Sequence, residues 1–351
     1  MSKLNSAMTD FIAEALLQRP KSITQILGGG NNQVYRVSLE SGEHYALKSY
    51  HVDQYEKDLF RMRRELDSFS FLYQCDEKQI PQVVAFDHKQ LLALYSWIDG
   101  NPITEITHHD ILVSVDFISR LKQYSKKNEA KKMLLASDHA LSIENVFSQI
   151  DRRIHFFEKD AADHMTLQGF LKKKFKPLYH KVRGQFYQKN VLGWESLPLE
   201  KAILSPSDFG CHNMLKNENN AIFFIDFEYF GWEDPAALLA HFLLHPSMQL
   251  SEKNRALFYE KLSSLYSEDP LFQKRFHTLF YLLGFAWVLI ILNEFLPYKQ
   301  KHRLSAGRFS REDIAHIQTT QLKKATQRFE QLEKMEQSAY LENRMKQGSL
   351  C

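Results

Sequence analysis

The sequence has few cysteines, and their spacing does not suggest a disulfide framework. Its 351 residues include only Cys75, Cys211 and Cys351, which lie far apart and form no C-x-x-C pair. An odd number of widely spaced cysteines favours a reducing compartment. The first twenty residues contain acids and no long apolar stretch, so we do not expect a secretory signal. We expect the chain to be cytoplasmic.

Excess charge and long apolar runs are also missing. The formal net charge is only +3, which is too small to indicate nucleic-acid binding by itself. Basic runs at 122–132 and 172–183 motivate that alternative, but acids are mixed into the same region, as is typical of solvated helix faces. The apolar run from Leu279 to Leu292 is shorter than the roughly 18 residues that span a bilayer. We therefore predict a buried core helix there and no nucleic-acid or membrane partner.

The hydrophobic pattern changes character near residue 97. Alternating residues predict strands over 34–39, 45–49, 80–87 and 91–95, with a helix over 52–74. Beyond residue 98 the pattern is mostly helical, and it ends in an amphipathic helix over 310–345. We predict an α+β, two-lobed fold. Residues 1–97 form a small N-lobe with a five-stranded antiparallel sheet and one helix, and residues 98–351 form a larger helical C-lobe.

A run of small residues lies between two of the predicted strands. Gly28, Gly29 and Gly30 are followed by Asn31 and Asn32. A dinucleotide-binding turn would open a helix, and a P-loop would end in Gly-Lys-Ser/Thr, and neither follows here. Glycines without a Cβ allow the backbone to fold closely over phosphates. A flexible hairpin tip is the alternative interpretation.

Lys48 lies in an apolar strand, Tyr45-Ala46-Leu47-Lys48. A half-buried lysine needs an anionic partner, because an unpaired buried ammonium is costly. Glu65, at the inner margin of the 52–74 helix, is a candidate that would orient Lys48 toward phosphates. A solvent-facing lysine on an edge strand and an ion pair within the helix are the alternatives.

The stretch 204–231 carries a second group of polar residues. Asp208 and Asn213 are five residues apart in a loop, and Asp226 follows the apolar strand 221–225. Carboxylate and amide oxygens brought together in this way suit Mg²⁺. The spacing D-x-x-x-x-N followed by an Asp at a strand end is also that of a kinase catalytic loop and its metal-binding Asp.

Two further segments bear on the predicted site. The segment Ser96, Trp97 and Ile98 joins the two predicted lobes, and we expect its backbone groups to contact an adenine ring, as linkers between lobes do in kinases. Asp234 before Pro235 predicts a helix start. His241 and His245 have the i, i+4 spacing of a zinc helix, but the Glu of H-E-x-x-H and a third ligand are missing. We predict core or cap histidines.

Glu228, Trp232 and Asp234 are candidate contacts for the acceptor. Acids beside the site would suit an amine-bearing acceptor, and an indole ring stacks on a sugar or encloses a quaternary amine. Helix capping and the helix dipole explain the acids equally well.

In the order and spacing of these motifs, the chain resembles the aminoglycoside phosphotransferase and choline kinase-like family, which has a protein-kinase-like fold. The resemblance covers residues 20–300. It rests on Ile26-Leu27-Gly28-Gly29-Gly30-Asn31-Asn32 with Tyr35-Arg36-Val37, on Ala46-Leu47-Lys48, on Arg64-Glu65, on Asp208 to Asn213, and on Ile225-Asp226-Phe227-Glu228.

The resemblance implies an ATP-dependent kinase that transfers the γ-phosphate to a hydroxyl of a small acceptor such as an aminoglycoside, choline or a sugar-like molecule. It implies that Asp208 is the catalytic base and that Asn213 and Asp226 hold Mg²⁺. Lys48, oriented by Glu65, would pair with the phosphates. The residues that would cover the triphosphate are Gly29, Gly30, Asn31 and Asn32.

The chain departs from the family pattern at two positions. The family usually has His-Gly-Asp where this chain has Pro206-Ser207-Asp208, and it tends to have an Asp where this chain has Leu238. The missing histidine motivates an alternative, a pseudokinase that acts as a nucleotide-binding or scaffold module. Residues 227–234 are too few for the activation loop of a protein kinase, which favours a small-molecule acceptor.

Overall fold

The computed structural model describes residues 3–26, 32–50, 55–188, 196–305 and 311–337. Its N-terminal part is a five-stranded antiparallel sheet in the order β1-β2-β3-β5-β4. The strands are β1 (Ser22–Ile26), β2 (Gln33–Ser38), β3 (His44–Ser49), β4 (Val83–Asp87) and β5 (Leu92–Ser96). The predicted sheet is confirmed.

The β2–β3 hairpin closes through a turn that depends on a glycine. The Leu39 carbonyl accepts a hydrogen bond from Gly42 N–H at 3.2 Å, and Leu39 N–H donates to the Glu43 carbonyl at 3.0 Å. Gly42 has φ +88°, a left-handed conformation that a residue with a Cβ rarely adopts. This turn sets the register that pairs Lys48 with Val34, and on its other side Lys48 pairs with Ala93 of β5.

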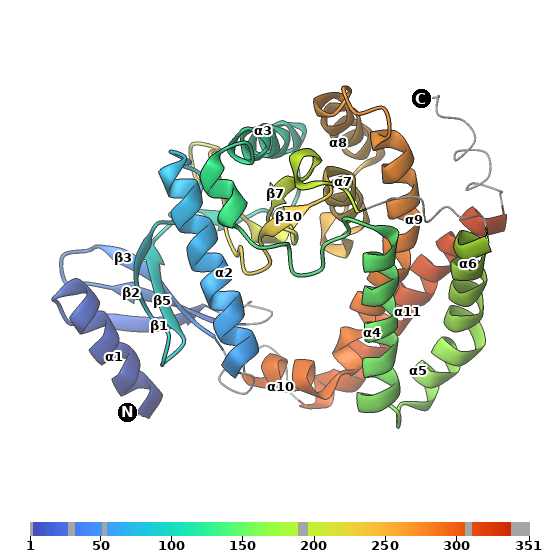
Figure 1. The fold of residues 1–351 in the computed structure, drawn as a ribbon. Helices are drawn as coiled ribbons and strands as arrows, with labels where there is room; N and C mark the ends of the chain where they lie inside the picture. Colours follow the sequence, from blue (N-terminus) through green and yellow to red (C-terminus); the bar gives the residue numbers. More distant parts are fainter. Residues whose placement is uncertain (1–2, 27–31, 51–54, 189–195, 306–310, 338–351) are drawn as a thin grey trace.

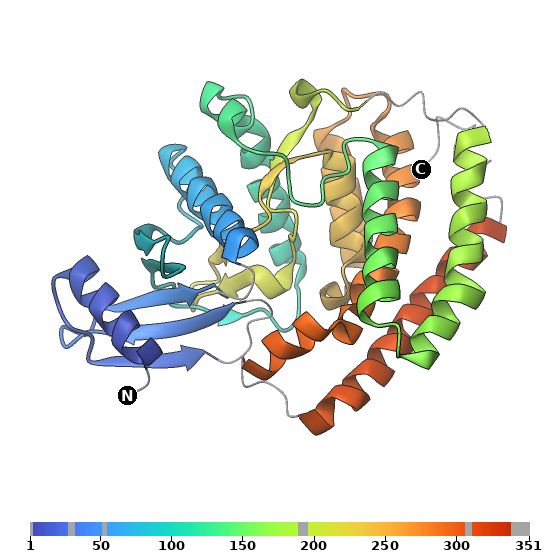
Figure 2. The same ribbon diagram turned by 60° about the horizontal axis from the view of Figure 1, so that its bottom comes forward.

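Two helices pack against this sheet. Helix α1 (Lys3–Leu16) buries Met8, Phe11 and Ile12 against strand residues including Val37 and Leu47, in a small core of its own. Helix α2 (Tyr55–Gln74) lies between the sheet and the rest of the molecule (Figures 1 and 2). Its residues belong to the large core shared with the C-terminal part. The boundary at residue 97 therefore stays a prediction, because α2 packs with both parts.

The C-terminal part is mainly helical. Its helices are α3 (His108–Tyr124), η1 (Asn128–Lys132), α4 (Ile143–Asp160), α5 (Met165–Phe170), η2 (Leu171–Phe175), α6 (Lys176–Gln188), η3 (Leu199–Lys201), η4 (Cys211–Asn213), α7 (Pro235–Leu244), η5 (Pro246–Met248), α8 (Glu252–Leu265), α9 (Phe272–Ile291), η6 (Leu292–Phe295), α10 (Pro297–Ser305) and α11 (Arg311–Gln337). Two small sheets support the loops between them. One pairs β7 (Ile203–Ser205) with β10 (Gly231–Glu233), and the other orders β6 (Asn101–Pro102), β8 (Met214–Lys216) and β9 (Ile222–Phe224).

Helix α9 is the centre of the C-terminal core. Among the described residues, only the segment Phe272–Phe295 is long and apolar enough to cross a membrane, and 78% of its most apolar window is buried inside the protein. Burial on all sides is typical of a core helix. The prediction of a buried helix at 279–292 is confirmed, and the cytoplasmic location stays a prediction.

The last helix packs on this core. Ala325, Phe329 and Leu332 of α11 are buried, as their helical spacing predicts. At Gly284 in α9, a Cβ would lie 2.6 Å from Leu332 Cδ2, so the missing side chain allows the two helices to approach closely. The predicted C-terminal helix is confirmed as far as Gln337, and residues 338–345 of the prediction lie outside the described part.

Candidate active site

Lys48 and Glu65 form a buried ion pair between the sheet and α2. The Lys48 Nζ is 2.7 Å from Glu65 Oε2, and the two side chains are only 9% and 2% exposed. Glu65 is held by further donors, because the Tyr50 hydroxyl bonds Oε2 and the Phe227 backbone N–H donates to Oε1 at 3.1 Å. The pairing expected from the sequence is therefore present.

The same lysine also contacts the beginning of the loop that follows β9. Its Nζ is 2.6 Å from Asp226 Oδ1 and 3.8 Å from Glu228 Oε2. Asp226 has φ +65°, which turns the chain sharply where the strand stops. Arg61 of α2 pairs with Glu228 from the opposite side, and Asn32 Nδ2 donates to Glu228 Oε2 at 2.7 Å.

This cluster carries surplus negative charge. The pKa of Asp226 is raised to about 6, because burial, Glu228 and Glu65 together outweigh the opposing effect of Lys48. A carboxylate in such surroundings is stabilised by an additional cation. The donor set therefore fits a divalent metal ion.

Asp208 lies in the loop between β7 and η4. Asn213 Nδ2 donates to the Asp208 carbonyl at 2.9 Å, which leaves Asn213 Oδ1 as an acceptor. The Asn213 carbonyl accepts from Ile225 N–H at 3.0 Å, next to Asp226. Ser207, with φ +67°, provides the bend before Asp208. Asn213 thus bonds both the loop that carries Asp208 and the residue before Asp226, so the loops that carry these two acids lie side by side.

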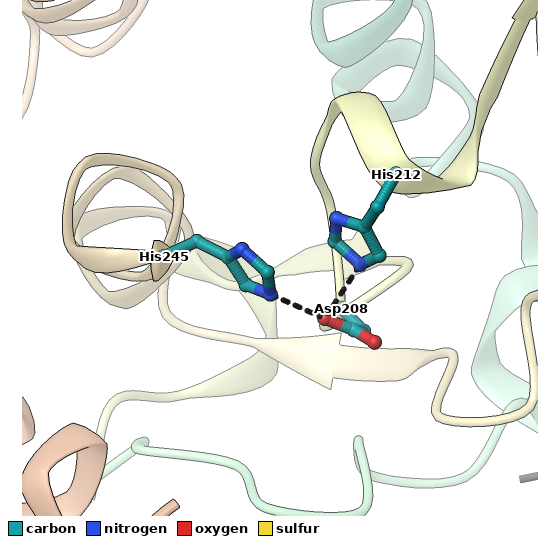
Figure 3. A group of neighbouring side chains, drawn as sticks. All are labelled: Asp208, His212 and His245. Carbon is teal, nitrogen blue, oxygen red and sulfur yellow. Dashed lines mark ion pairs between the residues drawn. The ribbon is translucent and has the colours of Figure 1, made fainter. Parts of the chain in front are cut away.

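Two histidines contact the Asp208 carboxylate, as Figure 3 shows. Oδ1 is 3.2 Å from His212 Nε2 and 3.4 Å from His245 Nε2, and the two rings stack with centroids 4.2 Å apart. Hydrogen bonds from both rings outweigh the effect of burial and hold the pKa of Asp208 well below its usual range. The carboxylate is therefore ionised at neutral pH.

The tautomer of His245 follows from its other nitrogen. Ser247 N–H donates to His245 Nδ1 at 3.1 Å, so Nδ1 is an acceptor. Burial lowers the pKa of His245, and a neutral ring whose Nδ1 accepts must carry its proton on Nε2. That proton is donated to Asp208 Oδ1.

The three side chains also have the composition of a metal site. The ligand atoms of Asp208, His212 and His245 lie within 4.8 Å of one another. Binding a metal through His245 Nε2 would move the ring proton to Nδ1, where it would face the Ser247 N–H. We therefore interpret the group as hydrogen bonds that position Asp208.

The contact of these two histidines with Asp208 was not predicted from the sequence. His212 lies inside the Asp208–Asn213 loop, and His245 ends α7. His241 agrees with the expected core position, since its Nδ1 accepts from Trp287 Nε1 at 3.2 Å. His245 caps η5 as well, but it also faces Asp208. The i, i+4 spacing was visible, whereas the approach of the α7 terminus to the loop depends on tertiary packing.

A cavity of 780 Å³ opens beside Asp208. Its walls come from α2, α4, α9 and α10, together with Tyr229 and the histidines of α7. Residues of α4 and α10 line the cavity together with Asp208. It is large enough for a small organic molecule.

The structure describes only some of the other predicted nucleotide contacts. Gly29, Gly30 and Asn31 lie outside the described residues, and Asn32 is buried against Glu228. In the segment between the lobes, Ser96 N–H already donates to the Gln82 carbonyl at 2.9 Å. Arg36 packs over the Trp97 ring at 4.9 Å, and Ile98 is buried. The Ser96 amide is thus occupied, and an adenine contact through the backbone of Ser96, Trp97 and Ile98 remains a prediction.

The predicted acceptor contacts Glu228, Trp232 and Asp234 all have partners within the protein. Trp232 is 4% exposed and donates Nε1–H to the Ala130 carbonyl at 3.2 Å. Asp234 caps α7 through Ala236 N–H at 2.8 Å and pairs with Arg275 at 2.7 Å. Neither lines the cavity, and Glu228 lies behind Arg61. Helix capping explains Asp234, which agrees with the alternative interpretation of the acids, and core packing explains Trp232.

Comparison with known proteins identifies solved structures with a similar fold. No protein-family profile and no curated protein sequence matches the chain. The structure is similar to choline kinase of Streptococcus pneumoniae, with a TM-score of 0.57, 15% identity, and coverage of 94% of this chain and 100% of that one. It is also similar to APH(2″)-IIa in complex with gentamicin (TM-score 0.60, 15% identity, 94% and 97% coverage) and to Plasmodium vivax ethanolamine kinase (0.55, 14%, 90% and 85%).

At these identities the likeness establishes the fold. The chain has the two-part fold of small-molecule kinases and phosphotransferases, as the resemblance in its motifs predicted. The first two of these matches each cover 94% of this chain.

Proposed function

We propose that this chain is an ATP- and Mg²⁺-dependent kinase of a small hydroxyl-bearing molecule. The observation that carries the proposal is a connected set of residues. Lys48 pairs with Asp226, Asn213 bonds both the Asp208 carbonyl and the Ile225 N–H beside Asp226, and Asp208 lines a cavity of 780 Å³. Lys48 comes from β3, Asp226 from the loop after β9, and Asp208 from the loop after β7. The fold is also that of an APH(2″)-IIa enzyme solved as a ternary complex with streptomycin and ATP.

In this proposal the cluster around Lys48 binds the nucleotide phosphates. Glu65 orients the ammonium group, and Asn32 with the preceding Gly29, Gly30 and Asn31 covers the phosphate chain. Asp226 and Asn213 Oδ1 hold Mg²⁺, which neutralises negative charge on the phosphates when bound. The raised pKa of Asp226 supports this assignment, because a cation would offset its surplus negative surroundings.

Asp208 would accept the proton of the acceptor hydroxyl. The hydroxyl oxygen forms a bond to the γ-phosphorus, the bond from that phosphorus to the ADP oxygen breaks, and the proton passes to the carboxylate. Histidines occupy Oδ1, so Oδ2 is the oxygen left for the substrate. A low pKa makes Asp208 a weak base, which suits a loose transition state in which positioning matters more than early proton removal.

The pseudokinase alternative loses the observation that motivated it. The chain has Pro206 where the family has a histidine, but His245 supplies an imidazole contact to Asp208 from α7. Among the described residues the Lys48–Glu65 pair is also intact.

Transfer from γ-labelled ATP tests the proposal. The protein is incubated with a panel of amino alcohols, sugars, sugar phosphates, aminoglycosides and nucleosides, with and without Mg²⁺. We expect label to enter at least one acceptor only when Mg²⁺ is present, and to be lost in Asp226→Asn. Nucleotide binding without transfer to any acceptor or to water would favour the pseudokinase instead.

A further inference from the structure

One wall of the cavity beside Asp208 is unusually basic. Arg152 and Arg153 of α4 both pair with the carboxylate of Asp138, at 2.7 Å and 2.5 Å. Lys57 of α2 lines the same cavity and interacts electrostatically with Asp138 and Arg153. Three cationic side chains thus share one acid.

The other charges of the cavity do not remove this excess. Arg61 pairs with Asp58 at 2.8 Å and also with Glu228 behind the wall. Asp160 and Lys299 contribute one charge of each sign. Apart from Asp208, the lining carries five basic and three acidic side chains. The positive surplus is therefore concentrated at Lys57, Arg152 and Arg153.

Two observations indicate that this group lacks an anion. Arg153 Nε is buried and donates to no group among the described residues. Burial lowers the pKa of Lys57, and the nearby Arg61 lowers it further, as expected for an ammonium group among like charges. A buried donor without a partner is costly, and an arriving oxyanion satisfies it.

The remaining lining is aromatic. Phe156 lies on α4, Trp287 on α9 and Tyr298 on α10, and all three line the cavity. The Lys57 ammonium lies 5.4 Å from the centre of the Tyr298 ring. Flat apolar surfaces next to guanidinium groups suit a ring that bears an anionic substituent.

Building on the proposed function, we propose that the acceptor is a hydroxyl compound that carries a phosphate or carboxylate group. Its anionic group binds Lys57, Arg152 and Arg153, and its hydroxyl reaches Asp208, which lines the same cavity. The structural neighbours named for choline and ethanolamine take cationic acceptors. A cation placed here would meet like charges, so this chain selects the opposite sign.

Binding of simple ions tests directly whether the cavity prefers a negatively or a positively charged molecule. The nucleotide site is first filled with Mg²⁺ and a non-hydrolysable ATP analogue, so that added anions cannot bind there. Inorganic phosphate is then titrated, and in a separate sample choline, while the fluorescence of Trp287 is followed against a Trp287→Phe blank. We expect saturable phosphate binding and no saturable choline binding over the same concentrations.

Variants assign the signal to this wall. The double variant Arg152→Gln/Arg153→Gln should weaken phosphate binding about tenfold or more, because charge-assisted hydrogen bonds are lost. Lys159→Gln is the matched control, since Lys159 is an exposed residue of the same helix and does not line the cavity. It should bind phosphate as the unmodified protein does.

The outcomes separate this inference from the proposed function. Three results would each overturn the anionic acceptor. They are saturable choline binding, phosphate binding that survives the double substitution, and no phosphate binding up to about 50 mM. An affinity weaker than about 50 mM would be of no use to a metabolic enzyme. The proposed function is judged independently, by whether label passes from γ-labelled ATP to any acceptor or to water when Mg²⁺ is present. Because the titration is repeated without nucleotide, it gives an answer even if the nucleotide does not bind.

Discussion

His245 Nε2 lies 3.4 Å from Asp208 Oδ1, and this contact joins the end of α7 to the loop after β7. The ring is fixed from both sides, because Ser247 N–H bonds its Nδ1. His245 therefore presents a proton to Asp208 without needing to be charged. In this chain a histidine distant in sequence contacts the carboxylate of the loop that begins with Pro206 and Ser207.

A first prediction concerns this contact. His245→Gln should lower kcat about tenfold, or about 1.4 kcal/mol, and should leave KM for ATP within about twofold, because the carboxylate loses a positioning donor while the phosphate site is untouched. Steady-state kinetics measure both constants. His155→Gln, an exposed position on α4, is the control. A parallel rise in KM for ATP would indicate a general structural role instead.

Replacing Lys48 should expose the charge surplus around it. Lys48→Met leaves Glu65, Asp226 and Glu228 without their shared cation, so the free energy of unfolding should fall by about 3–5 kcal/mol. Denaturant unfolding measures the loss, and added Mg²⁺ should recover part of it. In the control Lys21→Met, an exposed pair with Glu40 is lost, and the change should stay below about 1 kcal/mol. Equal effects at the two lysines would contradict the charge argument.

Glu233 should make stability depend on pH. Burial raises its pKa from 4.5 to about 8, so the folded protein holds a proton that the unfolded chain releases. Stability is therefore full below pH 4.5 and falls as the pH rises toward 8, by at most about 1.4 kcal/mol per pH unit. Glu233→Gln should remove this slope, as measured by denaturant unfolding at several pH values. Glu200→Gln, at an exposed position, should keep it. A wild-type slope in Glu233→Gln would disprove the assignment.

Gly231 should tolerate no side chain. A Cβ there would lie 2.5 Å from Ala136 N and 2.6 Å from Leu135 C, both backbone atoms. Gly231→Ala should destabilise the protein by about 1–3 kcal/mol. Gly184→Ala, in α6, is the control and should change stability in the opposite direction. A Cβ at this position meets nothing within 4 Å, so the substitution should stabilise the helix by about 0.5–1 kcal/mol. Thermal unfolding compares the two variants, and a stabilising Gly231→Ala would contradict the close approach.

The sequence was most informative where local spacing determines the structure. Alternation over β2 and β3 predicted the strand that carries Lys48, and the helical pattern placed Glu65 on its inner face. The D-x-x-x-x-N spacing predicted the loop in which Asn213 bonds the Asp208 carbonyl. Each of these features arises within one or two neighbouring elements, so the order of residues is enough to predict it.

The features that were missed depend on packing between distant elements. His245 reaches Asp208 because α7 ends beside the loop, and Arg152 faces the cavity because α4 packs against α9. Trp232 and Asp234 lie close to Asp226 in sequence, yet β10 and α7 carry them into the core. The acceptor side of the site is assembled from four helices, and no local pattern encodes that assembly.

The central claim is that Asp208 takes the proton in a phosphoryl transfer driven by Mg²⁺ and ATP. The most direct measurement compares Asp208→Asn with the unmodified protein, using transfer of label from γ-labelled ATP together with the melting-temperature shift caused by Mg²⁺ and ATP. Asparagine keeps an oxygen for both histidines but cannot accept the proton. The account predicts that transfer falls about 10²–10⁴-fold while the shift is retained. Transfer at the unmodified rate would contradict it.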